Sequence, residues 1–163
     1  MIVRAIALLA MLALASFAAE RRVVVEIFVS SECPISNKMA PEIERLTRKF
    51  DGMITLVYPN ESDTEEKIAA HRREYKLSAP AVRDPEHKRV KAAKATVTPE
   101  AAVLGARRTL LYRGRINDQF LAVGKGKPAP TRHDLEDAIV AALNGQKPHY
   151  AHIAAVGCYI EKR

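Results

Sequence analysis

One cysteine of the sequence lies where a thiol becomes reactive. Cys33 lies after the apolar, β-branched run 23–29, separated from it by the three polar residues 30–32, and directly precedes a stretch with apolar residues at helical spacing. A thiol at a helix N-terminus meets the positive end of the helix dipole and unpaired backbone N–H groups, which favour the thiolate. Pro34 suits the first helical turn, and Ser36 is placed to hydrogen-bond the sulfur. We predict a nucleophilic Cys33, the alternatives being a buried structural thiol and a mere capping role for Ser36.

A thiolate that attacks a disulfide needs a second thiol to complete the exchange. Cys158 is the only other cysteine of the sequence. The serine at position 36 cannot resolve a mixed disulfide on Cys33. Cys158 lies in a C-terminal tail, 146–163, which has no clear periodicity and is long enough to fold back over the edge of the site. We therefore predict that Cys158 is the resolving cysteine, with a static Cys33–Cys158 bridge or an unpaired structural cysteine as alternatives.

The elements expected along the chain alternate between strand and helix. Turn signals and apolar periodicity predict strands at 23–29, 54–58, 79–83, 101–104 and 109–112, helices at 34–50, 62–77, 85–94 and 131–143, and a flexible loop at 124–130. The first two strands and the helix between them form a βαβ unit, so they are parallel, and the last two form a hairpin. A single α/β domain with a central mixed sheet flanked by helices accounts for this order.

Two helix starts are expected from capping residues. Asp84 as N-cap and Pro85 at the first helical position begin the third helix. Thr131 and Asp134 form a capping box for the last helix. The inner face of that last helix is expected to carry Leu135, Ile139 and Leu143.

Two motifs resemble the thioredoxin family. Residues 33–36 (Cys-Pro-Ile-Ser), followed by 38–41 (Lys-Met-Ala-Pro), resemble the active-site segment in which Cys-x-x-Cys opens a helix containing Ala-Pro. Thr98-Pro99, just before the strand 101–104, resembles the Thr-Pro that faces the active-site sulfur through a cis bond. The resemblance covers most of residues 20–145.

The resemblance implies a thioredoxin-like fold with an α/β element inserted at about 63–94. It further implies that the protein is a thiol-disulfide oxidoreductase without an organic cofactor, in which Pro99 holds the backbone that docks a substrate strand. Pro34 and Thr98 then contact the substrate, a protein or small-molecule thiol or disulfide.

The sequence also departs from the family pattern. Ser36 replaces the second active-site cysteine, and the apolar Ile27 stands where a buried acid is expected. Glu26 is adjacent but points to the other face of the strand. A peroxiredoxin signature has proline where Glu26 stands and serine or threonine where Ser30 stands, so only half of it is present. A thiol peroxidase, and a non-catalytic module that binds a protein or copper, remain the alternatives.

The composition and the remaining motifs exclude several other classes of protein and site. The chain has 163 residues and a net charge of +7, which favours anionic partners without naming one. Two cysteines exclude a disulfide scaffold or an all-cysteine metal site, and His149, His152 and Cys158 form at most a weak, irregularly spaced soft-metal motif. Residues 124–127 (Gly-Lys-Gly-Lys) lack the continuation of a phosphate loop, and the scattered basic residues do not indicate nucleic-acid binding. No role is evident for residues 113–118.

The N-terminus resembles an export signal. Residues 1–4 carry a positive charge, 5–15 are apolar, and 16–18 offer small residues for cleavage. The apolar run is shorter than a typical membrane span, which favours a cleaved signal peptide over the alternative of an uncleaved anchor. We predict a signal peptide at 1–18, a domain at 19–145, the tail at 146–163 and a periplasmic or secreted protein without stable membrane insertion.

Overall fold

The computed structural model describes residues 23–161. The signal peptide expected at 1–18 lies outside the described residues. Within 23–161, none of the helices is long and apolar enough to cross a membrane.

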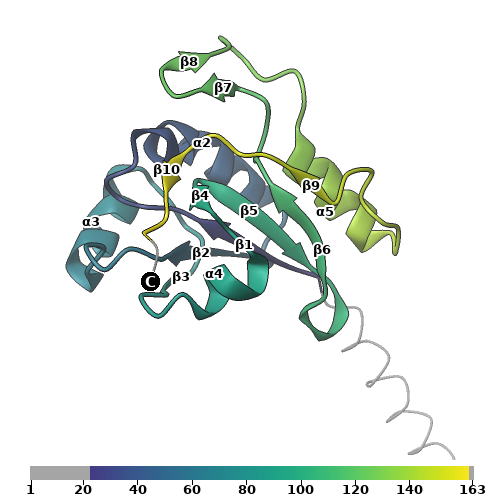
Figure 1. The fold of residues 1–163 in the computed structure, drawn as a ribbon, viewed down its shortest axis with the longest axis horizontal. Helices are drawn as coiled ribbons and strands as arrows, with labels where there is room; N and C mark the ends of the chain where they lie inside the picture. Colours follow the sequence, from purple (N-terminus) through teal and green to yellow (C-terminus); the bar gives the residue numbers. More distant parts are fainter. Residues whose placement is uncertain (1–22, 162–163) are drawn as a thin grey trace, which may run out of the picture.

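A six-stranded mixed sheet forms the centre of the molecule (Figure 1). Its strand order is β3-β2-β1-β5-β6-β9, with β1 parallel to β2 and antiparallel to β5. Two short pairs, β4 with β10 and β7 with β8, lie beside this sheet. The strands are β1 (Val24–Phe28), β2 (Ile54–Tyr58), β3 (Ala81–Arg83), β4 (Val97–Thr98), β5 (Glu100–Leu104), β6 (Leu110–Gly114), β7 (Phe120–Ala122), β8 (Lys125–Gly126), β9 (His152–Ile153) and β10 (Cys158–Tyr159).

Helices cover both faces of the sheet. They are α2 (Pro34–Lys49), α3 (Glu65–Glu74), α4 (Lys88–Ala93) and α5 (Asp134–Leu143), with a 3₁₀ turn, η1 (Ala106–Arg108), in the β5–β6 hairpin. The apolar residues of α2 and α5 pack in one core with Val25 and Ile27 of β1, whereas Val90 of α4 packs in a second core with Phe28. The alternation of side chains along β1 therefore divides the two cores.

The same alternation decides the environment of Glu26. This residue is fully buried on the α4 side of β1, where its carboxylate pairs with Arg89 and, at 2.7 Å, with Arg108. Ile27 faces the core that contains Cys33. Glu26 thus points away from the cysteine, as its position in the strand predicts.

The third helix begins later than its capping signals predict. It starts at Lys88 rather than Pro85, and His87 in the left-handed conformation is its N-cap. Asp84 nevertheless caps it from a distance, because its Oδ2 accepts hydrogen bonds from the backbone N–H groups of Arg89 and Val90, both at 2.9 Å. The capping residue was identified correctly, but the intervening turn was not.

Replacing Asp84 should measurably destabilise the fold. Asp84→Ala leaves two N–H groups of α4 without their acceptor, and the expected loss is about 1–2 kcal/mol of the free energy of unfolding. Chemical denaturation measures this loss. The control is Glu86→Ala, which removes only a solvent-exposed ion pair with Lys88 and should leave the free energy of unfolding nearly unchanged. Equal losses in the two variants would contradict the capping role.

The expected capping box of the last helix does not form. Helix α5 begins at Asp134, with His133 at the N-cap position and no side-chain cap. The Thr131 hydroxyl instead donates to Asp118 at 2.7 Å, and the Asp134 carboxylate pairs with Arg115 at 2.6 Å. Both capping residues are therefore committed to tertiary contacts. Leu135 and Ile139 are buried as predicted, but Leu143 is 46% exposed.

Two segments expected to be irregular contain short strands. The loop 124–130 holds β8, which pairs with β7 in a hairpin above the start of α2 (Figure 1). The tail contributes β9, which extends the central sheet beside β6, and β10, which pairs with β4. The tail therefore crosses the molecule and brings Cys158 to the edge of the domain.

Candidate functional site

Cys33 lies at the N-terminus of α2. It is the N-cap residue, with Pro34 at the first helical position, and it is 2% exposed. Its Sγ donates a hydrogen bond to the backbone carbonyl of Thr98, at 2.9 Å. The thiol therefore lies between a strand and a helix, as predicted.

The loop that carries Cys33 is held by polar side chains of the loop between β2 and α3. Asp63 is fully buried and accepts hydrogen bonds from the Ser31 backbone N–H at 3.0 Å and from its hydroxyl. Asn60 donates to the Ser30 hydroxyl at 3.0 Å. These contacts fix the strand-to-helix turn, and a fixed turn is a condition for a preorganised sulfur.

The two cysteines meet at Thr98. The Thr98-Pro99 peptide bond is cis, and Thr98 is the last residue of β4. Strand β10 is antiparallel to β4, with Cys158 directly opposite Thr98. The carbonyl of Thr98 accepts the hydrogen bond from Cys33, so both thiols lie against the same residue. In contrast to Cys33, Cys158 is exposed, and both cysteines are free thiols.

Hydrogen bonds lower the pKa of Cys33. Burial of the thiol acts to raise its pKa, but hydrogen bonds from Cys158 and from the backbone and side chain of Ser36 outweigh burial. The hydrogen bond to the Thr98 carbonyl belongs to the protonated thiol, since a thiolate has no proton to donate. The net direction is downward, so the thiolate is more populated than for an ordinary cysteine.

The pKa of Cys158 moves in the opposite direction. Burial, followed by the hydrogen bond and the charge of Cys33, raises it to about 11. Two of these three effects depend on Cys33 being a thiolate. Once Cys33 is in a mixed disulfide, its charge is gone, and Cys158 becomes easier to ionise. In the reduced pair, the thiolate is therefore favoured on Cys33 and the protonated thiol on Cys158.

The weak metal motif of the tail does not assemble. His149 makes an edge-to-face contact with Tyr150, and His152 contacts Arg113 rather than Cys158. Among residues 23–161, the donor groups that gather closely enough for a metal are those of Glu42, His133 and Glu136.

Glu136 also pairs with Arg45 and Lys49, so its carboxylate charge is already compensated.

Residues 113–118 have structural contacts, among them the ion pair of Arg115 with Asp134 and the Asp118 interactions with Thr131.

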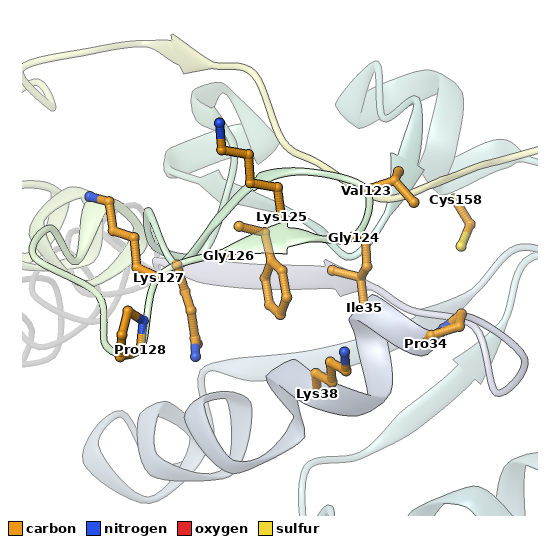
Figure 2. Close-up of a pocket in the computed structure, with 12 residues that line it drawn as sticks. Pro34, Ile35, Lys38, Val123, Gly124, Lys125, Gly126, Lys127, Pro128 and Cys158 are labelled. Carbon is orange, nitrogen blue, oxygen red and sulfur yellow. The ribbon is translucent and has the colours of Figure 1, made fainter.

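A cavity beside Cys158 was missed by the sequence analysis. It has a volume of about 690 Å³ and lies between the start of α2 and the β7–β8 hairpin (Figure 2). It is lined by Pro34, Ile35, Lys38, Gln119, Phe120, Val123, Gly124, Lys125, Gly126, Lys127, Pro128 and Cys158. The hairpin that forms one wall had no clear signal, because its strands are short and include glycine.

Comparison with known proteins addresses the fold. No family model matches the chain, and no curated protein matches it significantly. It is similar to the crystal structure of an uncharacterized conserved protein from Geobacillus kaustophilus, with a TM-score of 0.76, 21% identity, and coverage of 89% of this chain and 80% of that one. A hypothetical protein from Sinorhizobium meliloti matches with a TM-score of 0.73, 25% identity, and coverage of 92% and 84%.

A third match carries a functional description. It is a putative thiol:disulfide interchange protein DsbE from Chlorobium tepidum, with a TM-score of 0.56, 17% identity, and coverage of 77% of this chain and 83% of that one. A solved structure described as thioredoxin-like is also among the matches. The chain therefore has a thioredoxin-like fold, in which a central mixed sheet is flanked by helices, and this confirms the predicted fold class.

Proposed function

We propose that the protein is an exported thiol-disulfide oxidoreductase in which Cys33 is the nucleophile and Cys158 the resolving cysteine. The observation that carries this proposal is the meeting of both thiols at Thr98. Cys33 donates to its carbonyl, and Cys158 is its cross-strand partner. The resemblance to a putative thiol:disulfide interchange protein supports the same class of reaction.

The first step takes place at Cys33. Its thiolate attacks one sulfur of a substrate disulfide, the other substrate sulfur leaves as a thiolate, and Cys33 is now in a mixed disulfide. Ser36, together with Cys158, stabilises the thiolate before attack. Pro34 and Thr98-Pro99 border the sulfur and are the residues that we assign to substrate contact. The cysteine is buried, so β10 must shift to admit the substrate.

The second step takes place at Cys158. Loss of the charge on Cys33 makes the neighbouring thiol easier to ionise, and its thiolate attacks the Cys33 sulfur. The remaining substrate sulfur leaves as a thiolate, and a Cys33–Cys158 disulfide remains. The substrate has gained two electrons, which an external thiol must restore to the protein. No organic cofactor takes part in this cycle.

We propose that the protein is located outside the cytoplasm. This location rests on the pattern of residues 1–18, with a short positive start, an apolar run and small residues at the cleavage position. A Cys33–Cys158 disulfide persists more readily in that compartment than in the cytosol. N-terminal sequencing of the mature protein from a host cell tests cleavage after residue 18.

The pH dependence of alkylation tests the nucleophile. In the reduced protein, the rate at which iodoacetamide modifies Cys33, followed by peptide mass spectrometry, should have its midpoint below the ordinary thiol pKa of 9.0. Ser36→Ala should move the midpoint upward, because donors to the thiolate are lost. The rate falls below the midpoint, where the thiol is protonated. Alkylation of Cys33 that occurs only as the protein unfolds contradicts the proposal. A separate turnover assay compares a hydroperoxide with a disulfide as substrate, and faster consumption of the hydroperoxide favours the peroxidase alternative.

A further inference from the structure

The sulfurs of the two cysteines differ in their access to solvent. Cys158 is exposed and borders the 690 Å³ cavity, whereas Cys33 is 2% exposed and is not among the residues that line it. Figure 2 shows the Cys158 sulfur directed toward the start of α2, at Pro34. A molecule in the cavity therefore reaches Cys158 first.

Departure of the Cys33 thiolate is stabilised within the site. In thiol-disulfide exchange, the sulfur that leaves faster is the one whose thiol has the lower pKa. The backbone and side chain of Ser36 act to lower the pKa of Cys33, and these donors remain when Cys158 carries the small thiol. Attack on Cys158 is thus favoured by access, and the Cys33 thiolate leaves beside the Ser36 donors.

The walls of the cavity indicate which kind of thiol it accepts. Its apolar surface comes from α2 and from the hairpin, chiefly Ile35, Phe120 and Val123. Three lysines and no acidic residue are among the lining residues. Lys127 is paired with Asp118, which leaves Lys38 and Lys125 as the charges available to a ligand.

The two available lysines are placed differently. Lys38 is exposed and rises from α2 toward the hairpin, so its ammonium lies beside the cavity (Figure 2). Lys125 is exposed on β8, and in Figure 2 its side chain extends away from α2. Lys38 is therefore the residue expected to contact an anion, and Lys125 adds to the positive potential around the entrance.

We propose that this cavity binds a small thiol that carries carboxylate groups, and that this thiol reduces the Cys33–Cys158 disulfide by attack on Cys158. This proposal rests on the proposed function, because it requires that disulfide. The incoming thiolate forms a bond to the Cys158 sulfur, the bond between the two cysteines breaks, and Cys33 leaves as a thiolate. A second small thiolate then attacks the bound small-thiol sulfur, releasing Cys158 and a small-molecule disulfide. Two external thiols are oxidised, and the protein disulfide is reduced.

The test begins with the disulfide itself. The protein is oxidised, and non-reducing peptide mapping establishes whether Cys33 and Cys158 are linked. Absence of that link contradicts the proposed function and this inference together. With the link present, the remaining measurements concern the cavity alone, so the two failures are distinguishable.

Reduction rates then test the preference for an anion. The oxidised protein is treated with mercaptosuccinate, neutral 2-mercaptoethanol or cationic cysteamine, quenched with acid, and its free cysteines are counted by mass spectrometry. Each rate is normalised to the thiolate concentration. Lys38→Gln should lower the ratio of the mercaptosuccinate rate to the 2-mercaptoethanol rate by about three- to fivefold, the effect of one exposed ion pair. Comparing this ratio between the variant and the wild type cancels the intrinsic reactivity of each thiol, because only the protein differs.

A matched control separates local charge from net charge. Lys147→Gln removes the same charge from an exposed position outside the lining residues, and its ratio should equal that of the wild type. An equal fall in both variants, or no fall in Lys38→Gln, overturns the proposed cavity.

The site of attack is a separate readout. When the reaction is quenched with an alkylating reagent, the intermediate should carry the small thiol on Cys158 and the alkyl group on Cys33. The reverse labelling, with the small thiol on Cys33, overturns the proposal.

Discussion

Replacing Cys158 with serine is expected to stop the reaction after its first step. The Cys158→Ser variant keeps Cys33 at the N-terminus of α2 but has no internal thiol to attack the mixed disulfide. Turnover of a disulfide substrate should fall to the uncatalysed background in the absence of excess small thiol. Mass spectrometry of the variant after one addition of substrate should show a stoichiometric adduct on Cys33.

Two comparisons make this result specific. Cys33→Ser should lose turnover equally but accumulate little adduct on Cys158, because burial by itself still raises the pKa of that thiol. A Cys158→Ala variant should also have a higher pKa at Cys33, since it removes the group that donates to the Cys33 thiolate. Undiminished turnover in Cys158→Ser would show that an external thiol performs the second step.

Much of the nucleophile's setting could be predicted because its signals are local. A β-branched run, a short polar turn, a cysteine, a proline and an amphipathic stretch follow one another within one segment, and proline and apolar periodicity restrict the backbone there. Strand β1, helix α2 and strand β2 formed as expected. The face of Glu26 also followed from strand alternation alone.

The partners of Glu26 could not be predicted, because pairing depends on elements far along the chain. Arg89 lies in α4 and Arg108 in η1, and neither has a spacing signal relative to position 26. The same reason explains the failed capping box of α5. Thr131 has a capping residue type, but the buried Asp118 carboxylate competes for its hydroxyl, and only the folded chain brings the two together.

The place of Cys158 was the least predictable part of the site. Strand β10 contains two residues, too few for a periodic pattern, and it exists only because β4 offers an edge. Assigning Cys158 by its being the second thiol was correct as to proximity, but the sequence contains no signal for the strand pairing that produces it. The cavity follows from the same pairing and from the β7–β8 hairpin, so it was missed for the same reason.

Gly157 is the residue on which that pairing most depends. A Cβ atom at position 157 would lie 2.3 Å from the carbonyl oxygen of Thr98 and 2.7 Å from its carbonyl carbon. Both are backbone atoms, so no side-chain movement relieves the overlap. Gly157→Ala is therefore expected to displace β10 from β4 and to separate Cys158 from Cys33. The rate of Cys33–Cys158 disulfide formation should fall on the order of 10²-fold, the effect of misplacing a reacting group by about 1 Å.

The fold should survive this change, because β10 contributes only a two-residue pair at the edge of the domain. Circular dichroism should match the wild type, while the pKa of Cys33 rises with the loss of its contact to Cys158. Ala154→Ser, at an exposed position of the same tail, is the control and should oxidise at the wild-type rate. If Gly157→Ala forms the disulfide as fast as this control, the two cysteines do not depend on the β4–β10 pairing, and the tail reaches Cys33 by another route.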